Sequence, residues 1–129
     1  MNTNQALTLI LALLNKKHAH YTSIYNTTRQ LQQLVSGEDP DAFGNLLDTR
    51  KTAMDSIDSI DREISATLSR LPDPLREKMK ACLKPSGTAL TLDDPLQTNI
   101  YDAGRRNAIL LKRIIESDNT LTQSIKRRD

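Results

Sequence analysis

The clearest pattern in the chain is a stripe of apolar residues that recurs every three or four positions between residues 39 and 71. It consists of two rows with a seven-residue repeat and a few neighbours, namely Phe43, Arg50, Ile57, Ile64 and Leu71, then Leu46, Ala53, Ile60 and Thr67, with Leu47, Met54 and Leu68 beside them. Because an α-helix turns by about 100° per residue, the rows merge into one apolar seam. A seam sustained over about four heptads predicts a long helix lying along other long helices.

The start of this helix carries its own signal. Asp39 is a good N-cap residue, Pro40 suits the first helical position, and Asp41 places negative charge at the positive end of the helix dipole. The Asp-Pro pair recurs at Asp73-Pro74 and at Asp94-Pro95. We therefore expect each of the three pairs to open a helix.

Further apolar stripes lie on both sides of this segment. Residues 3–35 predict a first long helix, and residues 95–126 predict a last one. A shorter helix is expected over residues 74–83, followed by an extended loop at residues 84–93. The connection at residues 36–40 is short enough to force an antiparallel hairpin.

These elements predict an all-α fold: an elongated antiparallel bundle or coiled coil of three long helices with one short connecting helix, forming a single domain over residues 1–129. The composition agrees, because 37% hydrophobic and 3% aromatic residues with no Trp suit aliphatic helix seams better than a β-sandwich. Cys82 is the only cysteine, which excludes an internal disulfide and fits a reducing compartment. The N-terminal apolar run ends at Lys16 and lacks a basic leader, so we expect a cytoplasmic protein without membrane insertion.

The net charge of +2 is unevenly distributed along the chain. Residues 1–37 have three bases and no acid, residues 38–73 have nine acids and four bases, and residues 95–129 have seven bases and four acids. Opposite charges on successive segments suggest an acidic middle helix packed between two more basic ones. A nucleic-acid-binding protein more often gathers its bases on one face, so no nucleic-acid partner is expected.

The sequence offers little for catalysis. His18 and His20 are the only histidines, and a spacing of two places them on different sides of a helix. Asp55, Asp58 and Asp61 have a spacing that suits a divalent cation, but the heptad positions favour a solvated acidic face. The chain has no Gly-rich phosphate loop, nucleophile elbow or Cys/His cluster. We therefore expect no enzyme, no metal and no cofactor.

Arg50 lies on the apolar seam between Phe43 and Ile57. One interpretation is a register-setting residue whose stem lies along apolar side chains while its guanidinium reaches the edge. The other is an interface arginine for a partner or for an internal carboxylate.

The last predicted helix has the most distinctive binding feature. Leu110-Leu111 and Ile114-Ile115 double the width of its apolar stripe. Two explanations are open: both members of each pair face the other long helices, or Leu111 and Ile115 are left over and form the edge of a groove. Such a groove edge suits an amphipathic partner helix.

Residues 21–64 resemble the FlgN-like flagellar export chaperone family. The shared features are a Tyr-containing first helix, a short acidic turn and a Leu-Leu-x-x-Arg motif followed by an Ile/Leu-Asp repeat, here Tyr21, Leu46, Leu47, Arg50, Ile57, Asp58, Ile60 and Asp61. Residues 110–121 are also similar to the last helix of that family. With this segment included, the resemblance covers most of the chain.

The resemblance implies a cytoplasmic, non-enzymatic chaperone of flagellar type III secretion. Such a protein binds and masks the C-terminal helical segments of hook–filament junction proteins and delivers them to the export apparatus. The implied client-binding residues lie in the last helix: Leu110, Leu111, Ile114, Ile115, Leu121 and Ile125. The residues alone also fit a structural helical adaptor or dimerisation module without chaperone activity, and they leave the client and any homo-oligomer undetermined.

Overall fold

The structure is a computed structural model that describes residues 1–35, 37, 39–84, 92 and 94–128. Its secondary structure consists of four helices: α1 (Thr3–Gln33), α2 (Pro40–Leu68), α3 (Asp73–Leu83) and α4 (Pro95–Arg128). The described residues contain no strand, so the predicted all-α fold class is confirmed there. Most of the loop expected at residues 84–93 lies outside the described residues.

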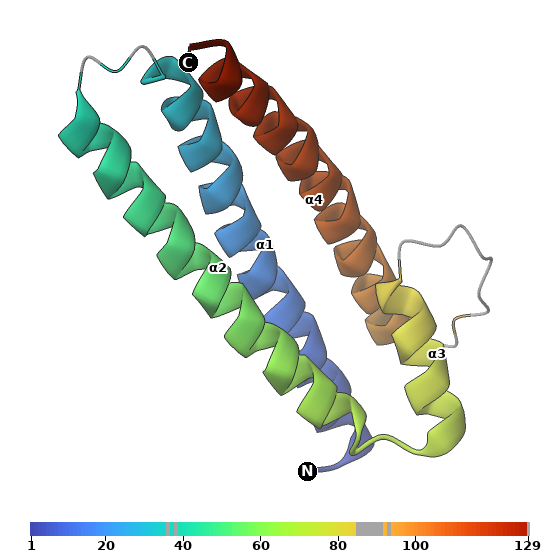
Figure 1. Ribbon diagram of the computed structural model, residues 1–129. Coiled ribbons are helices and arrows are strands. Elements are labelled where there is room, and N and C mark those ends of the chain that lie inside the picture. The colour runs from blue at the N-terminus through green and yellow to red at the C-terminus, as the bar shows by residue number, and fades with distance from the viewer. Residues whose placement is uncertain (36, 38, 85–91, 93, 129) are drawn as a thin grey trace.

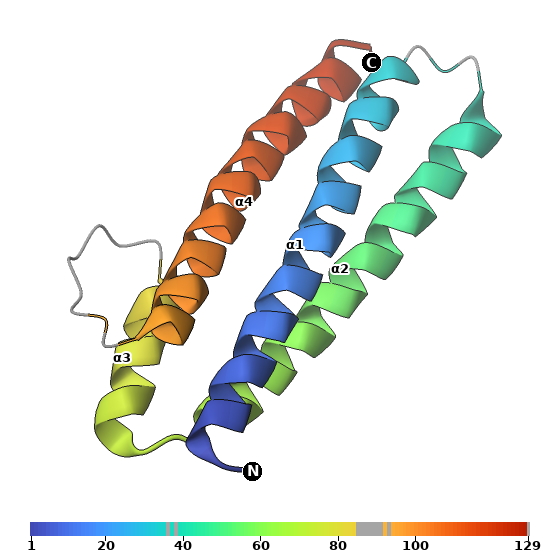
Figure 2. The same cartoon turned by 180° about the vertical axis from the view of Figure 1, so that it is seen from behind.

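Helix α1 lies in the middle of the molecule. It packs against α2 and α4, while α3 packs against α4 and the end of α2. Within the described ranges, the backbones of α2 and α4 do not contact each other. Figures 1 and 2 show the consequence from opposite sides: α2 and α4 run along α1 on either side of it.

The core has two parts along this axis. The larger part lies where all four helices meet, and its most deeply buried side chains are Leu7, Ile10, Met79, Cys82, Ile100 and Ala103. The smaller part consists of Tyr21, Ile24, Ala53, Ile57 and Ile114, where only α1, α2 and α4 contribute. The Leu-rich start of α1 is therefore buried on several sides, because it packs among the other three helices.

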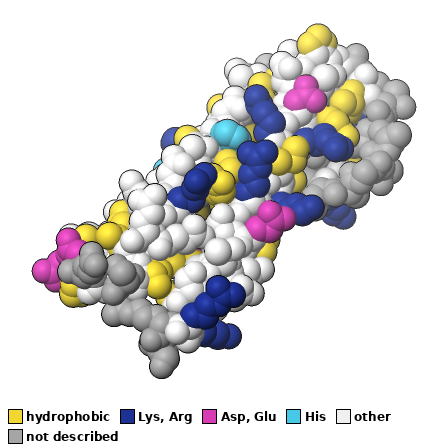
Figure 3. Space-filling model, turned by 90° about the horizontal axis from the view of Figure 1, so that it is seen from above, with side chains coloured by type: hydrophobic (Ala, Val, Ile, Leu, Met, Phe, Trp, Pro, Cys, Tyr) yellow, Lys and Arg dark blue, Asp and Glu magenta, His cyan; other side chains and the backbone are white. Residues whose placement is uncertain are grey.

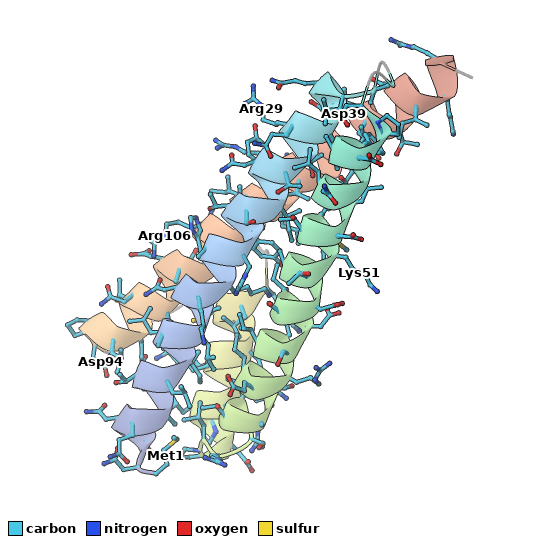
Figure 4. All side chains as sticks on the ribbon, turned by 90° about the vertical axis from the view of Figure 1, so that its left-hand side faces the viewer. Met1, Arg29, Asp39, Lys51, Asp94 and Arg106 are labelled. Carbon is cyan, nitrogen blue, oxygen red and sulfur yellow. The ribbon has the colours of Figure 1, made fainter. Side chains whose placement is uncertain are left out.

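Two of the three Asp-Pro pairs cap helices as predicted. The Asp39 carboxylate accepts a hydrogen bond from the Ala42 backbone N–H at 3.0 Å, and Asp94 accepts one from the Gln97 N–H at 2.8 Å. These two caps lie toward opposite ends of the molecule (Figure 4). Such side-chain acceptors satisfy backbone donors that a helix start leaves unpaired.

The prediction for the third pair was wrong in detail. Helix α3 begins at Asp73 rather than Pro74, and Pro72 occupies the N-cap position without a side-chain cap. Because Asp73 is already helical, its carboxylate forms an ion pair with Arg76 one turn further on. An Asp-Pro pair thus marks the start of this helix without capping it.

The other helix ends differ from the predicted ones by a few residues. Helix α1 ends at Gln33 instead of Val35, and α2 ends at Leu68 instead of Leu71. Leu71 is still buried, because a turn carries it into the core after the helix has ended. At the other end of α1, the side chains of Asn2 and Gln5 form a capping box that the sequence reasoning did not include.

Candidate binding groove

A groove of about 740 Å³ runs between α2 and α4. Leu14 and Tyr21 of α1 form its floor, and the end of α3 contributes Leu83. An adjoining hollow of about 190 Å³ shares Tyr21, Leu111 and Ile115 with it and continues toward Arg50. The groove exists because α2 and α4 both pack on α1 while their own backbones stay apart.

The structure separates the six proposed client-binding residues of α4. Ile114 and Leu121 are buried, and Leu110 packs partly buried against the core that contains Tyr21. These three side chains belong to the packing of α4 within the protein. Of the three, Leu110 is only partly buried, and Ile114 also lines the adjoining hollow.

Leu111 and Ile115 lie on the neighbouring face of α4 and are 38% and 52% exposed. Both line the groove and the adjoining hollow. Ile125 is also exposed, but it lines a separate hollow at the far end, with Val35 and Phe43. The structure therefore brings together three of the six residues at one hollow, Leu111 and Ile115 exposed and Ile114 buried in its lining.

Sequence reasoning missed the residue that faces them from the opposite wall. Met54 of α2 is 47% exposed and lines the same hollow as Leu111 and Ile115. The sequence did contain a sign of this exposure. Leu47, Met54 and Asp61 share one seven-residue row, and the charged Asp61 places that row at the edge of the apolar seam of the helix. All three are exposed.

An ion pair connects the two walls of the groove. Nη2 of Arg50 on α2 donates to both carboxylate oxygens of Asp118 on α4, at 2.6 and 2.5 Å. Of the two interpretations of Arg50, the structure thus places it against an internal carboxylate. If either partner were removed, the other charge would remain partly buried and unpaired. The pair therefore links α2 to α4.

A second ion pair, which joins α1 to α2, lies at the edge of the same groove. Lys17 Nζ is 2.7 Å from a carboxylate oxygen of Asp61 and 5.4 Å from the centre of the Tyr21 ring. Burial alone would lower the pKa of Lys17, but the hydrogen bond to Asp61 and the attraction of Tyr21 and Asp61 outweigh it and raise that pKa. Lys17 therefore stays charged at the edge of the groove.

Asn107 is the most deeply buried polar side chain in the groove wall, with 5% of its surface exposed. Its Nδ2 donates to the backbone carbonyl oxygen of Leu14 on α1 at 3.1 Å. Its Oδ1 is buried and has no hydrogen-bond partner among the described residues. An unpaired buried carbonyl is unusual in a folded protein.

The described residues contain no group of three or more His, Cys, Asp or Glu side chains that could hold a metal ion. His18 and His20 are both partly buried on α1, and Asp55 and Asp58 are exposed. No helix within the described ranges is long and apolar enough to cross a membrane.

The outer surface of the bundle is charged. Helix α4 exposes Arg105, Arg106, Lys112 and Arg113. In the space-filling view of Figure 3, Lys and Arg side chains lie among hydrophobic ones, with fewer Asp and Glu side chains. Four bases of α4 are thus exposed within nine residues, which agrees with the predicted basic character of the last helix.

Comparison of the chain with protein-family models, curated proteins and solved structures gives no match. A functional assignment therefore depends on the residues and on the geometry of the groove.

Proposed function

We propose that the chain is a non-enzymatic chaperone that binds an amphipathic helix of a client protein in the groove between α2 and α4. The observation that carries this proposal is the exposure of Leu111, Ile115 and Met54 along one continuous hollow. Large apolar side chains that gather at one open site of a small protein usually mark a binding surface. An open groove between two helices, with a third beneath it, suits the helix-in-groove mode of recognition.

The particular function follows from the resemblance of residues 21–64 to the FlgN-like family. In this proposal the protein is a cytoplasmic flagellar export chaperone. Its clients are the C-terminal helical segments of hook–filament junction proteins, and it delivers them to the type III export apparatus. The chain acts as an elongated antiparallel bundle of three long helices, with the client helix as an additional member.

The proposed mechanism is masking. Leu111, Ile115 and Met54 take the place of the surfaces with which the client helix assembles after export. A partly exposed groove of this kind gives an interface of modest size, and such interfaces suit complexes that must later be released.

The experiment compares two isoleucines of α4 that differ in position but match in exposure. Ile115 lines the groove and is 52% exposed, whereas Ile109 is 54% exposed and lies about 200° around the helix from Leu111. Peptides from the C-terminal helices of junction proteins are titrated against wild type, Ile115→Asp and Ile109→Asp by fluorescence anisotropy. We expect Ile115→Asp to weaken binding at least about tenfold, because it places a charge in the apolar interface.

Ile109→Asp is the matched control and should bind the peptides within about twofold of wild type. Equal affinities of both variants would reject the groove as the site. Absence of binding to wild type would reject the client assignment. The alternative, a dimerisation module, predicts that the chain sediments as a dimer that Ile115→Asp dissociates.

A further inference from the structure

The groove contains a polar group that the fold leaves unsatisfied. Asn107 lies on α4 one turn before Leu111, and its side chain lines the groove. The amide nitrogen is fixed by its bond to the Leu14 carbonyl, so the orientation of the amide group is set by α1. The oxygen is left as a hydrogen-bond acceptor without a donor among the described residues.

The unpaired oxygen of Asn107 lies in mostly apolar surroundings. The side chains that line the groove around it are mostly apolar, among them Leu14, Ile64, Leu68 and Leu111. Leaving a buried acceptor unpaired destabilises a fold, and leucine, of similar size, would carry no such cost. The bond from Nδ2 to Leu14 uses only the donor half of the amide, so the oxygen is paired only if a donor reaches it in another state of the protein.

We propose that Asn107 selects client helices that carry one neutral hydrogen-bond donor, such as Gln, Asn, Ser or Thr, within their apolar stripe. This inference rests on the proposed function, because it assumes that a helix occupies the groove. In the complex, the Leu111 side chain turns aside and the client donor binds Asn107 Oδ1. Side-chain rotations of this kind are common when interfaces form.

The chemistry of the site favours a neutral donor over a charged one. Lys17 of the groove lining is already paired with Asp61, and the other charged side chains of the lining, Lys112 and Glu116, are exposed. A lysine or arginine from the client would lose its hydration beside Asn107 and gain a neutral amide oxygen there instead of a carboxylate. One buried polar pair in an apolar helix interface also fixes the register of the two helices, as a single buried asparagine does in coiled coils.

The test uses synthetic amphipathic peptides of about 22 residues, long enough to form stable helices on binding. The parent peptide has leucine at every position of its apolar stripe and Glu, Lys and Ala elsewhere. In each further peptide, one of these leucines is replaced by glutamine. Every peptide is titrated against wild type, Asn107→Leu and Asn26→Leu by fluorescence anisotropy.

Wild type should tolerate glutamine at one position of the stripe and lose affinity about tenfold at the others. Asn107→Leu should lose this tolerance, so that the favoured peptide binds about five- to tenfold more weakly relative to the parent. Asn26 is exposed on α1 and lies about 200° around that helix from Ile24, which lines the hollow. Asn26→Leu makes the same chemical change away from the groove and should behave as wild type.

Two results would overturn the inference, and they differ in what they say about the function. If the peptides bind wild type and Ile115→Asp abolishes binding, but no glutamine position is favoured, the groove binds helices without reading a donor. If none of the peptides binds wild type, both the helix-binding function and the role of Asn107 are rejected. The glutamine series on wild type gives this answer even if Asn107→Leu does not fold.

Discussion

Replacing Gly104 by alanine tests how closely α3 approaches α4. A Cβ atom at position 104 would lie 2.8 Å from the carbonyl oxygen of Cys82 and 3.7 Å from the Cα of Leu83. Close carbon–oxygen contacts between backbones normally fall at about 3.3 Å or more. Since both neighbours are backbone atoms of α3, the new methyl group can be accommodated only if α3 moves by about 0.5 Å.

Two opposing effects decide the size of the change. Inserting a methyl group into a packed interface typically costs about 1–3 kcal/mol. Alanine in a helix interior recovers about 0.5–1 kcal/mol relative to glycine, because it loses less backbone entropy on folding. We therefore expect Gly104→Ala to lower the free energy of unfolding by about 1 kcal/mol. The corresponding fall in Tm is about 4 °C.

Gly44 provides the matched control. It also lies inside a helix, α2, but beyond the local backbone of that helix no described atom lies within 4 Å of the Cβ that alanine would add. Gly44→Ala should therefore raise the free energy of unfolding by about 0.5–1 kcal/mol. Urea unfolding followed by far-UV circular dichroism measures both variants. If Gly104→Ala has the same free energy of unfolding as Gly44→Ala, the proposed clash between the new methyl group and the α3 backbone is refuted.

Two further predictions concern titratable groups. Burial raises the pKa of the Cys82 thiol and so disfavours its reactive thiolate form. Ellman's reagent at about pH 8 should therefore modify Cys82 at least about tenfold more slowly in the native protein than in the urea-unfolded chain. Equal rates would contradict the burial of the thiol. The raised pKa of Lys17 means that its contribution to stability is present below the unfolded-state pKa and is lost as the pH rises through the folded-state value. As the pH rises above about 10.5, wild type should therefore lose more unfolding free energy than Asp61→Asn, and parallel pH profiles would refute the pairing.

Much of the fold could be predicted because its signals are local. The three- and four-residue spacing of apolar positions locates each helix, and the caps at Asp39 and Asp94 mark two of the helix starts. Asp73 shows the limit of such signals. Whether a carboxylate caps the backbone or pairs with Arg76 depends on where the first helical residue falls, and the dipeptide does not specify this.

The candidate site could be predicted only in part, because the helices that pack against α4 decide which of its apolar side chains stay exposed. Leu110 and Leu111 are identical in type, yet one packs toward the core and the other lines the groove. A difference of about 100° around the helix axis decides between these environments. The apolar stripe gives the direction of α4 toward α1, but it does not reveal that the backbones of α2 and α4 stay apart.

The open groove itself requires an explanation, since apolar side chains on facing helices would gain from moving together. Contacts at two places along the groove oppose such closure. At one end, α3 packs between the end of α2 and the start of α4, and the short distance from Gly104 to Cys82 fixes α4 against α3. Further along, Arg50 and Asp118 join the two walls through an ion pair between long side chains, so the walls are linked there without backbone contact. Leu111 and Ile115 lie on α4 between these two contacts, and both side chains are exposed.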